Sequence, residues 1–241
     1  MRILYIFPHP DDESFGPAAV MHRQREEGHE VHLLTLTRGG ATKVRHALGL
    51  SVAAMGEVRL EEMRAVERTL DLTSMTVWDF EDSGLKNMDP RILEREIAGF
   101  VRELRPDVLV TYAVHGISGF HDHLVTHAVV KRVYLELRDA AVPLLRLGLL
   151  TVPDSGEATF IDGRIRLKHS MEAEIDCSVP LRAQDIDAMK RALACYATYQ
   201  ATIEDSGVVE KVGTRLHFEF FGESVSPPVE DLLEGLVASA H

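Results

Sequence analysis

The sequence predicts an α/β fold, with a Rossmann-like, mostly parallel sheet that carries helices on both faces. Apolar strand-like runs alternate with amphipathic stretches, which is typical of parallel sheets covered on both sides. Asp12-Glu13 in a first turn, Gly28 after a helix, and Pro90 and Pro106 on either side of another support the helix boundaries. Strands are expected at about 2–8, 30–37, 74–80 and 107–113, and helices at about 13–28, 57–71, 89–104 and 121–137.

Shorter β-like runs fill the last third of the chain. They fall at about 145–152, 159–161, 164–168 and 174–179, and Asp162-Gly163 between two of them is a hairpin signal. A helix is expected at about 181–203 and a late strand at 217–221. We therefore expect one domain over 1–241, with a Rossmann-like core at about 1–137 and a small β-rich embellishment of hairpins and a helix at about 140–241.

Composition excludes several classes of protein. The formal net charge of −12 argues against nucleic-acid binding, which needs a basic patch, and against adhesion to an anionic membrane surface. The apolar start of the chain ends at Pro8, which is too early for a secretory segment or a membrane span. The two cysteines, Cys177 and Cys195, are expected to stay reduced, so a cytoplasmic protein is predicted.

Residues 39–57 form a long connection that is rich in glycine and alanine and has no clear period. Connections of that length are usually functional or mobile, so a lid near the functional site is one interpretation. A short extra helix packed on the surface at about 42–48 is the other.

The first candidate functional segment is Pro8-His9-Pro10-Asp11-Asp12-Glu13, which directly follows the first apolar run. Ligands of parallel sheets bind at the carboxyl ends of strands. A histidine and an aspartate three residues apart at such a turn, His9 and Asp12, can converge on one divalent metal, which leaves Asp11 free to handle protons. The alternative is that Asp11 and Asp12 cap a helix.

A second group of candidate residues follows the run at 107–113. Here Gly116-Ile117-Ser118-Gly119-Phe120-His121-Asp122-His123 leads into a predicted helix. The two blocks together resemble the PIG-L/LmbE-like family of zinc-dependent N-deacetylases, whose motifs are usually written (A/P)HPDDE and HPDH. Further similarities are Thr37-Arg38-Gly39 to the family's TRG turn, Arg59 with Glu62 to its RxxE helix, and 80–85 to its F-x-D-x-G-L segment.

This resemblance implies a zinc-dependent hydrolase that removes an acetyl group from an N-acetylated amino sugar or GlcNAc conjugate. The family's metal ligands match His9, Asp12 and His123, which would hold Zn²⁺ or another divalent metal with one position open for water. Asp11 is then expected to accept a proton from that water. Arg59, Asp82 and Arg38 match or adjoin family positions near the sugar and are predicted to bind substrate. The resemblance also implies a homo-oligomer.

One departure from the family pattern concerns Phe120, which stands where HPDH has its first histidine. In the family that histidine helps to stabilise charge on the carbonyl oxygen, and losing one such donor typically costs about a hundredfold in rate. His121 or His115 is expected to substitute for it. If neither does, the chain would be a zinc-binding member with weak or different hydrolytic activity and a binding or regulatory role.

Other residues in these segments have open roles. His127 is interpreted as a core residue or as a neighbour of the ligands, although its spacing from His123 would also suit a ligand pair. Asp122 is expected either to orient a metal-binding imidazole or to cap a helix. Tyr196 stands where the family often has a histidine, and its role is left open. A nucleotide-binding module is disfavoured, because no GxGxxG turn follows the first strand.

Overall fold

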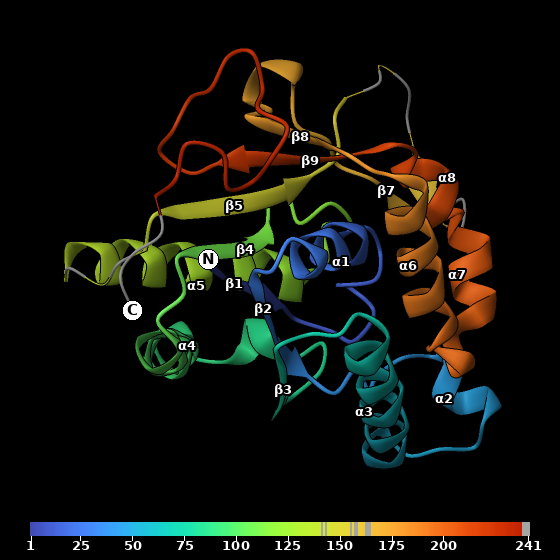
Figure 1. Cartoon of the computed structure of the whole chain (residues 1–241). Coiled ribbons are helices and arrows are strands. Elements are labelled where there is room, and N and C mark those ends of the chain that lie inside the picture. Colours follow the sequence, from blue (N-terminus) through green and yellow to red (C-terminus); the bar gives the residue numbers. More distant parts are fainter. Residues whose placement is uncertain (141, 143, 155, 157–158, 162–164, 238–241) are drawn as a thin grey trace.

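The computed structural model describes residues 1–237, apart from 141, 143, 155, 157–158 and 162–164. One seven-stranded sheet runs through the molecule in the order β3-β2-β1-β4-β5-β9-β8 (Figure 1). Strands β3, β2, β1, β4 and β5 are parallel, β9 pairs antiparallel with β5, and β8 pairs antiparallel with β9. The strands of this sheet are β1 (Arg2–Phe7), β2 (Glu30–Thr37), β3 (Ser74–Phe80), β4 (Val108–Tyr112), β5 (Arg146–Thr151), β8 (Cys177–Pro180) and β9 (Arg215–Phe220).

Helices cover both faces of the sheet, so the predicted fold class is confirmed. Figure 1 shows α4 and α5 on one side and α1, α3 and α6 on the other. The helices are α1 (Pro17–Glu26), α2 (Val44–Ala47), α3 (Val52–Thr69), α4 (Pro90–Leu104), α5 (His121–Asp139), α6 (Ala183–Ala194), α7 (Gln200–Ser206) and α8 (Val208–Val212). Single 3₁₀ turns are η1 (Leu85–Asn87), η2 (Glu172–Glu174) and η3 (Ala197–Tyr199).

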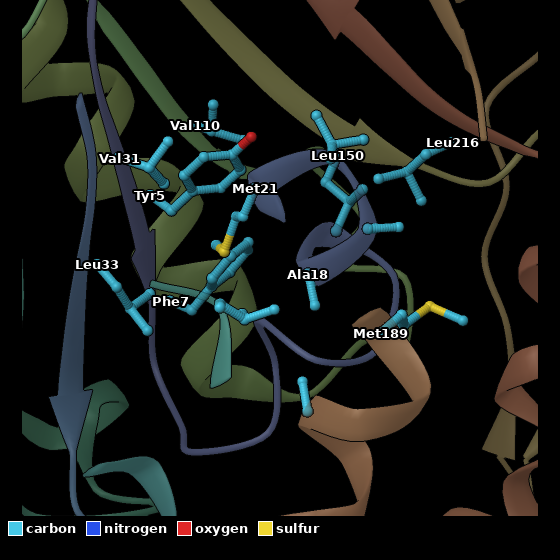
Figure 2. Close-up of a cluster of buried hydrophobic side chains, with 14 of the residues drawn as sticks. Tyr5, Phe7, Ala18, Met21, Val31, Leu33, Val110, Leu150, Met189 and Leu216 are labelled. Atoms are coloured by element: carbon cyan, nitrogen blue, oxygen red, sulfur yellow. The ribbon is translucent and has the colours of Figure 1, made fainter. Parts of the chain in front are cut away.

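Two hydrophobic cores follow from the period-two alternation of the buried strands. In β1, Tyr5 and Phe7 face the layer of α1, α3 and α6, whereas Leu4 and Ile6 face α4 and α5. Figure 2 shows the first of these cores, in which Met21 of α1 packs near Tyr5 and Phe7. Because β1 is buried on both faces, its apolar sequence is continuous up to the turn at Pro8.

Several predicted boundaries shift for local reasons. Helix α1 begins at Pro17 and not at 13, because Asp11 and Gly16 have φ angles of 83° and 132° that no helix can contain. Helix α3 begins earlier than predicted, at Val52, because the Ser51 side chain accepts a hydrogen bond from Ala54 N at 3.1 Å and caps it. The helix predicted at 181–203 is broken at Tyr196 into α6, η3 and α7.

The last third of the chain adds strands to the central sheet and is therefore more than the predicted embellishment. Strand β5 pairs with β4 in parallel, from Val108↔Arg146 to Tyr112↔Leu150, and therefore belongs to the central sheet. A separate small hairpin pairs β6 (Phe160–Ile161) with β7 (Ile165–Arg166), while the predicted Asp162-Gly163 turn lies outside the described residues.

The connection after β2 contains α2, a short helix with no buried residue among its members, so the interpretation as a short surface helix is confirmed there. Within the described part of the chain, no helix combines the length and apolar character needed to cross a membrane.

Candidate metal centre

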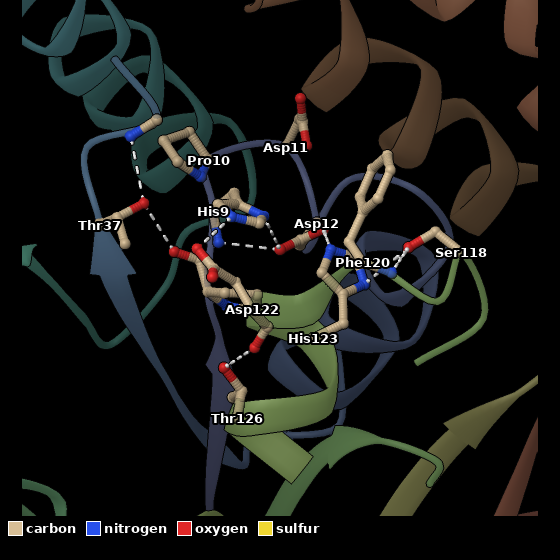
Figure 3. A network of polar contacts seen from close by, with 12 residues as sticks. His9, Pro10, Asp11, Asp12, Thr37, Ser118, Phe120, Asp122, His123 and Thr126 are labelled. Atoms are coloured by element: carbon tan, nitrogen blue, oxygen red, sulfur yellow. Dashed lines mark hydrogen bonds and ion pairs between the residues drawn. The ribbon is translucent and has the colours of Figure 1, made fainter. Parts of the chain in front are cut away.

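The candidate ligands lie at the carboxyl edge of the parallel sheet, where β1 and β4 end side by side. Strand β1 is the point at which the strand order reverses, since β2 and β3 lie to one side of it and β4 to the other. Such a switch point opens a crevice between the turns that follow the two strands. The β1 turn carries His9 and Asp12, and the first turn of α5 carries Asp122 and His123 (Figure 3).

Asp12 is the centre of this group. It is buried, its Oδ2 accepts a hydrogen bond from the main-chain nitrogen of His9 at 2.9 Å, and its Oδ1 accepts one from the Tyr112 hydroxyl at 2.7 Å. Burial alone would raise the pKa of Asp12, but His123, His9 and Tyr112 outweigh it and lower the pKa to about 2. Asp12 therefore stays ionised at any physiological pH.

His123 is fixed in one tautomer. Its Nδ1 lies 3.0 Å from the carbonyl oxygen of Gly116, which only accepts, so Nδ1 carries the proton. Its ring stacks on Tyr112, with centroids 4.3 Å apart and planes at 9°. Burial lowers the pKa of His123, and the lone pair on its Nε2 then faces Asp12 Oδ1 across 3.4 Å.

The donor set of this group fits a metal ion. One ligand-type atom from each of His9, Asp12 and His123 lies within 4.8 Å of the others. A neutral imidazole nitrogen that faces a carboxylate oxygen is repelled unless a cation lies between them, and two imidazoles with one carboxylate is a common set for catalytic zinc. The sequence-predicted ligands are thus brought together.

The opposite edge of His9 is held by acidic residues. Its Nε2 lies 3.2 Å from Asp122 Oδ2 and 3.4 Å from Asp82 Oδ1. Asp122 Oδ2 also accepts a hydrogen bond from Ser83 N at 2.8 Å, while its buried Oδ1 has no partner among the described residues. Burial lowers the pKa of His9, but hydrogen bonds with Asp12 and Asp122 raise it to about 10. Asp122 thus orients an imidazole, as one of the two predictions stated.

Asp11 is held at both its main chain and its side chain. Its φ of 83° is uncommon for any residue but glycine. Arg59 Nη2 donates to Asp11 Oδ2 at 2.7 Å and to Pro10 O at 2.8 Å, and Asp11 N donates to the Tyr196 hydroxyl at 2.8 Å. Burial raises the pKa of Asp11, Arg59 lowers it and Asp12 raises it, which leaves it at about 6. A carboxyl group in that range can both accept and release a proton near neutral pH.

Sequence reasoning missed Glu13 and left Tyr196 without a role. Glu13 is fully buried, and its Oε1 accepts a hydrogen bond from the Tyr196 hydroxyl at 2.7 Å. Burial raises the pKa of Glu13 to about 7 and that of Tyr196 well above its ordinary value. The sequence gives no local signal for this contact, because the segment around Tyr196 has the pattern of one continuous helix.

Two predicted catalytic histidines lie apart from the group. His121 is exposed, because residues two apart on a helix point about 200° away from each other and His123 faces inward. The His115 ring lies 3.2 Å from Thr151 Oγ1 and 3.1 Å from Ser170 Oγ, and its Nδ1 accepts from Ile117 N at 3.0 Å. Both nitrogens of His115 are therefore engaged, Nε2 with side chains on the side of β5 and Nδ1 within its own loop.

Phe120 stands at the open side of the group. Its side chain is 49 % exposed and meets the His123 ring edge-on, with centroids 5.6 Å apart and planes at 90°. Figure 3 shows the Phe120 ring rising from the start of α5 over His123 and Asp12. His127, one turn further along α5, donates from Nδ1 to Tyr112 O at 2.9 Å and is not one of the ligand group.

The three predicted substrate residues are placed differently. Asp82 lies at the group, where its Oδ2 accepts from Ala41 N at 2.7 Å. Arg59 is buried against Asp11, with its guanidinium carbon 4.3 Å from the centroid of the Tyr199 ring, so it contacts a catalytic candidate and not open solvent. Arg38 pairs with Glu57 and lies 3.5 Å from Asp79 Oδ1 on β3.

The family of this chain is decided by comparing its sequence with models of known protein families. The model described as "GlcNAc-PI de-N-acetylase", PIG-L, matches residues 4–134, which span more than half of the chain and include every candidate ligand. The chain belongs to the PIG-L family. The predicted membership is therefore confirmed.

Curated relatives and solved structures agree with PIG-L membership. A 1D-myo-inositol 2-acetamido-2-deoxy-alpha-D-glucopyranoside deacetylase from Thermomonospora curvata is 33 % identical over 54 % of this chain and 51 % of its own length. The chain spans about half the length of the first curated relatives that it matches.

Two solved structures share the fold at low identity. The teicoplanin deacetylase Orf2, in its zinc-inhibited form, has a TM-score of 0.69 at 14 % identity and covers 91 % of this chain and 97 % of its own. GalB of Pseudomonas putida KT2440, a 4-carboxy-2-hydroxymuconate hydratase, has a TM-score of 0.70 at 15 % identity and covers 95 % and 100 %. Because these two proteins are named for different reactions, the fold of the PIG-L family does not by itself determine the reaction.

Proposed function

We propose that this PIG-L protein is a zinc-dependent hydrolase that removes the acetyl group from an N-acetylated amino sugar or GlcNAc conjugate. The observation that carries the proposal is the convergence of ligand-type atoms from His9, Asp12 and His123 within 4.8 Å, with the partly buried carboxyl group of Asp11 on the same turn as two of them. The deacetylases among its relatives support the choice of reaction.

In this proposal each residue of the group has one task. His9, Asp12 and His123 hold the zinc ion, and Asp122 accepts a hydrogen bond from His9 Nε2 and so fixes the ring. A zinc ion bound there lowers the pKa of a water molecule and polarises an amide carbonyl. Asp82 lies next to His9 and is the predicted substrate residue placed to meet a sugar hydroxyl.

Proton transfer is assigned to Asp11. Its carboxylate accepts the proton that water loses as the oxygen attacks the amide carbonyl, and the protonated carboxyl then donates to the nitrogen of the departing amine. Arg59 keeps Oδ2 in place through the 2.7 Å hydrogen bond during both steps. A pKa of about 6 suits a group that must take up and release one proton in each cycle.

Phe120 is the observation that favours a second candidate function, a zinc-binding member with weak or different hydrolytic activity. An apolar ring in this position cannot donate a hydrogen bond to a developing oxyanion. Among the described residues, neither His121 nor His115 lies in the ligand group.

Phe120→His is therefore expected to raise kcat on an N-acetyl sugar by about 10²-fold, because one oxyanion donor typically contributes that much. The half-exposed position leaves room for an imidazole over His123. The measurement is steady-state kcat of both proteins at equal zinc content. Leu124→His, one helical turn along at a similarly exposed apolar position, is the control. An unchanged kcat in F120H would mean that another group already supplies the donor.

The proposal itself is tested by amine release from a panel of N-acetylglucosamine conjugates, with protein of known metal content. We expect one zinc per chain, release that stops with a chelator, and recovery when zinc is restored. Release that continues after complete metal removal would contradict the metal assignment. Bound zinc without release from any conjugate would reject the deacetylase and favour the second candidate.

We also infer a homo-oligomer and a cytoplasmic location from the family resemblance and the two reduced cysteines. Neither enters the reaction, and sedimentation velocity and fractionation of the source cells would test them.

A further inference from the structure

Tyr196 connects the C-terminal part of the chain to the turn that carries Asp11. It lies at the break between α6 and η3, with φ −84° and ψ 67°, and its side chain is fully buried. Its hydroxyl oxygen lies 2.8 Å from Asp11 N and 2.7 Å from Glu13 Oε1. Because the amide of Asp11 can only donate, the single phenolic proton is directed to Glu13. Both hydrogen bonds of the hydroxyl are thus fixed in direction.

Asp11 needs such support because of its backbone. A non-glycine residue in the left-handed region is strained and persists only where its surroundings hold it. Arg59 holds the side chain through Oδ2, while Tyr196 holds the main-chain nitrogen. These two anchors come from different parts of the fold and act on different atoms. Within the turn itself, the Asp11 carbonyl oxygen also accepts hydrogen bonds from Ser14 N at 2.7 Å and Phe15 N at 3.1 Å, so Tyr196 is the anchor of the Asp11 amide.

We infer that Tyr196 is a positioning residue, whose hydroxyl keeps the main chain of Asp11 in its left-handed conformation and so sets the place of the Asp11 carboxylate on the turn that also carries His9 and Asp12. The inference rests on the proposed function, in which Asp11 moves the proton. Displacing a proton-transfer group by about 1 Å can cost about 10²-fold in rate.

Tyr196→Phe tests this inference, because it keeps the ring that fills the core and removes both hydrogen bonds. We expect kcat on the preferred N-acetyl conjugate to fall by about 10- to 100-fold, with KM changed by less than about twofold and zinc content unchanged. The control is Tyr5→Phe. Tyr5 is also fully buried, and its hydroxyl donates only to Gln24 Oε1, at 2.9 Å. Y5F removes the same kind of group, and its kcat is expected to stay within about twofold of that of the parent protein.

A second measurement does not depend on activity. In the parent protein the amide of Asp11 should be protected from hydrogen exchange by its bond to Tyr196, and in Y196F a peptide covering residues 8–16 should exchange at least about tenfold faster. Y5F should leave that peptide unchanged. A parent protein that releases no amine would reject the proposed function, and the exchange data would still decide the role of Tyr196.

Three results would overturn the inference. One is a Y196F kcat within about twofold of the parent, and another is an equal loss of kcat in Y196F and Y5F, which would indicate general destabilisation. The third is rapid exchange of the Asp11 amide in the parent protein itself, which needs no variant and so remains decisive if Y196F does not fold.

Discussion

Asp11→Asn is expected to keep its zinc and to lose turnover by about 10²- to 10⁴-fold, the usual contribution of a general acid–base residue. The amide oxygen of asparagine can still accept the hydrogen bond from Arg59 Nη2, so the side chain stays in place, but it cannot take a proton from water. The measurement is kcat together with zinc content per chain.

Asp79→Asn is the matched control for this prediction. Asp79 is an exposed carboxylate on the edge strand β3 and is not in the ligand group. We expect it to retain both zinc and turnover. Loss of zinc from D11N to the same extent as from a ligand variant would show that Asp11 holds metal, and would reject its role in proton transfer.

His123→Ala is expected to lose both metal and turnover. In the proposed centre its Nε2 is the ligand that α5 contributes opposite Asp12, and its removal would leave two ligands from a single turn. Loss of the metal removes several kcal/mol of transition-state stabilisation, equal to a fall in kcat of more than about 10³-fold. Zinc content after dialysis and kcat measure the two effects separately.

His127→Ala is the control on the same helix. His127 is likewise buried and lies one turn away, but its Nδ1 donates to Tyr112 O. The variant should be less stable and should still bind one zinc per chain. If H127A lost zinc while H123A kept it, the assignment of the ligand from α5 would be wrong.

The sequence was sufficient to predict the segments in which the structure depends on local pattern. Strand β1 is apolar from Ile3 to Phe7, and the polar turn after it lies at the edge where parallel strands end, so His9 and Asp12 are predicted at one turn, where the structure has them. The convergence of His123 on that turn followed from a second strand end, because β1 and β4 are neighbours.

Two other contacts between distant parts of the chain have no signal in the sequence. Arg59 lies on α3, and helical spacing does not show which buried group its side chain will meet, so its contact with Asp11 has no signal in the sequence. The Tyr196 contact needed the break between α6 and η3, which is a tertiary effect in a segment whose local pattern suits one helix.

His115 and His121 show two ways in which proximity in sequence misleads. The loop after β4 bends at Gly116 and Ile117, whose φ angles are 62° and 56°, and it carries His115 toward β5. His121 faces away from the ligand group, because it precedes the inward-facing His123 by two residues. The bend of the loop has no signal in the motif, whereas the two-residue spacing of His121 and His123 on one helix does indicate that their side chains point apart.

The separation of the ligand-bearing segments has a consequence for how the protein unfolds. His9 and Asp122, which directly precedes the ligand His123, are 113 residues apart in the chain. An ion bound between the two segments would act as a reversible cross-link that closes a very long loop. In chain-entropy terms, a link across about 100 residues restricts the conformations of the unfolded chain. The link therefore destabilises the unfolded state by about 4 kcal/mol for as long as it holds. Zinc would thereby couple the integrity of the whole parallel sheet to the occupancy of one small site.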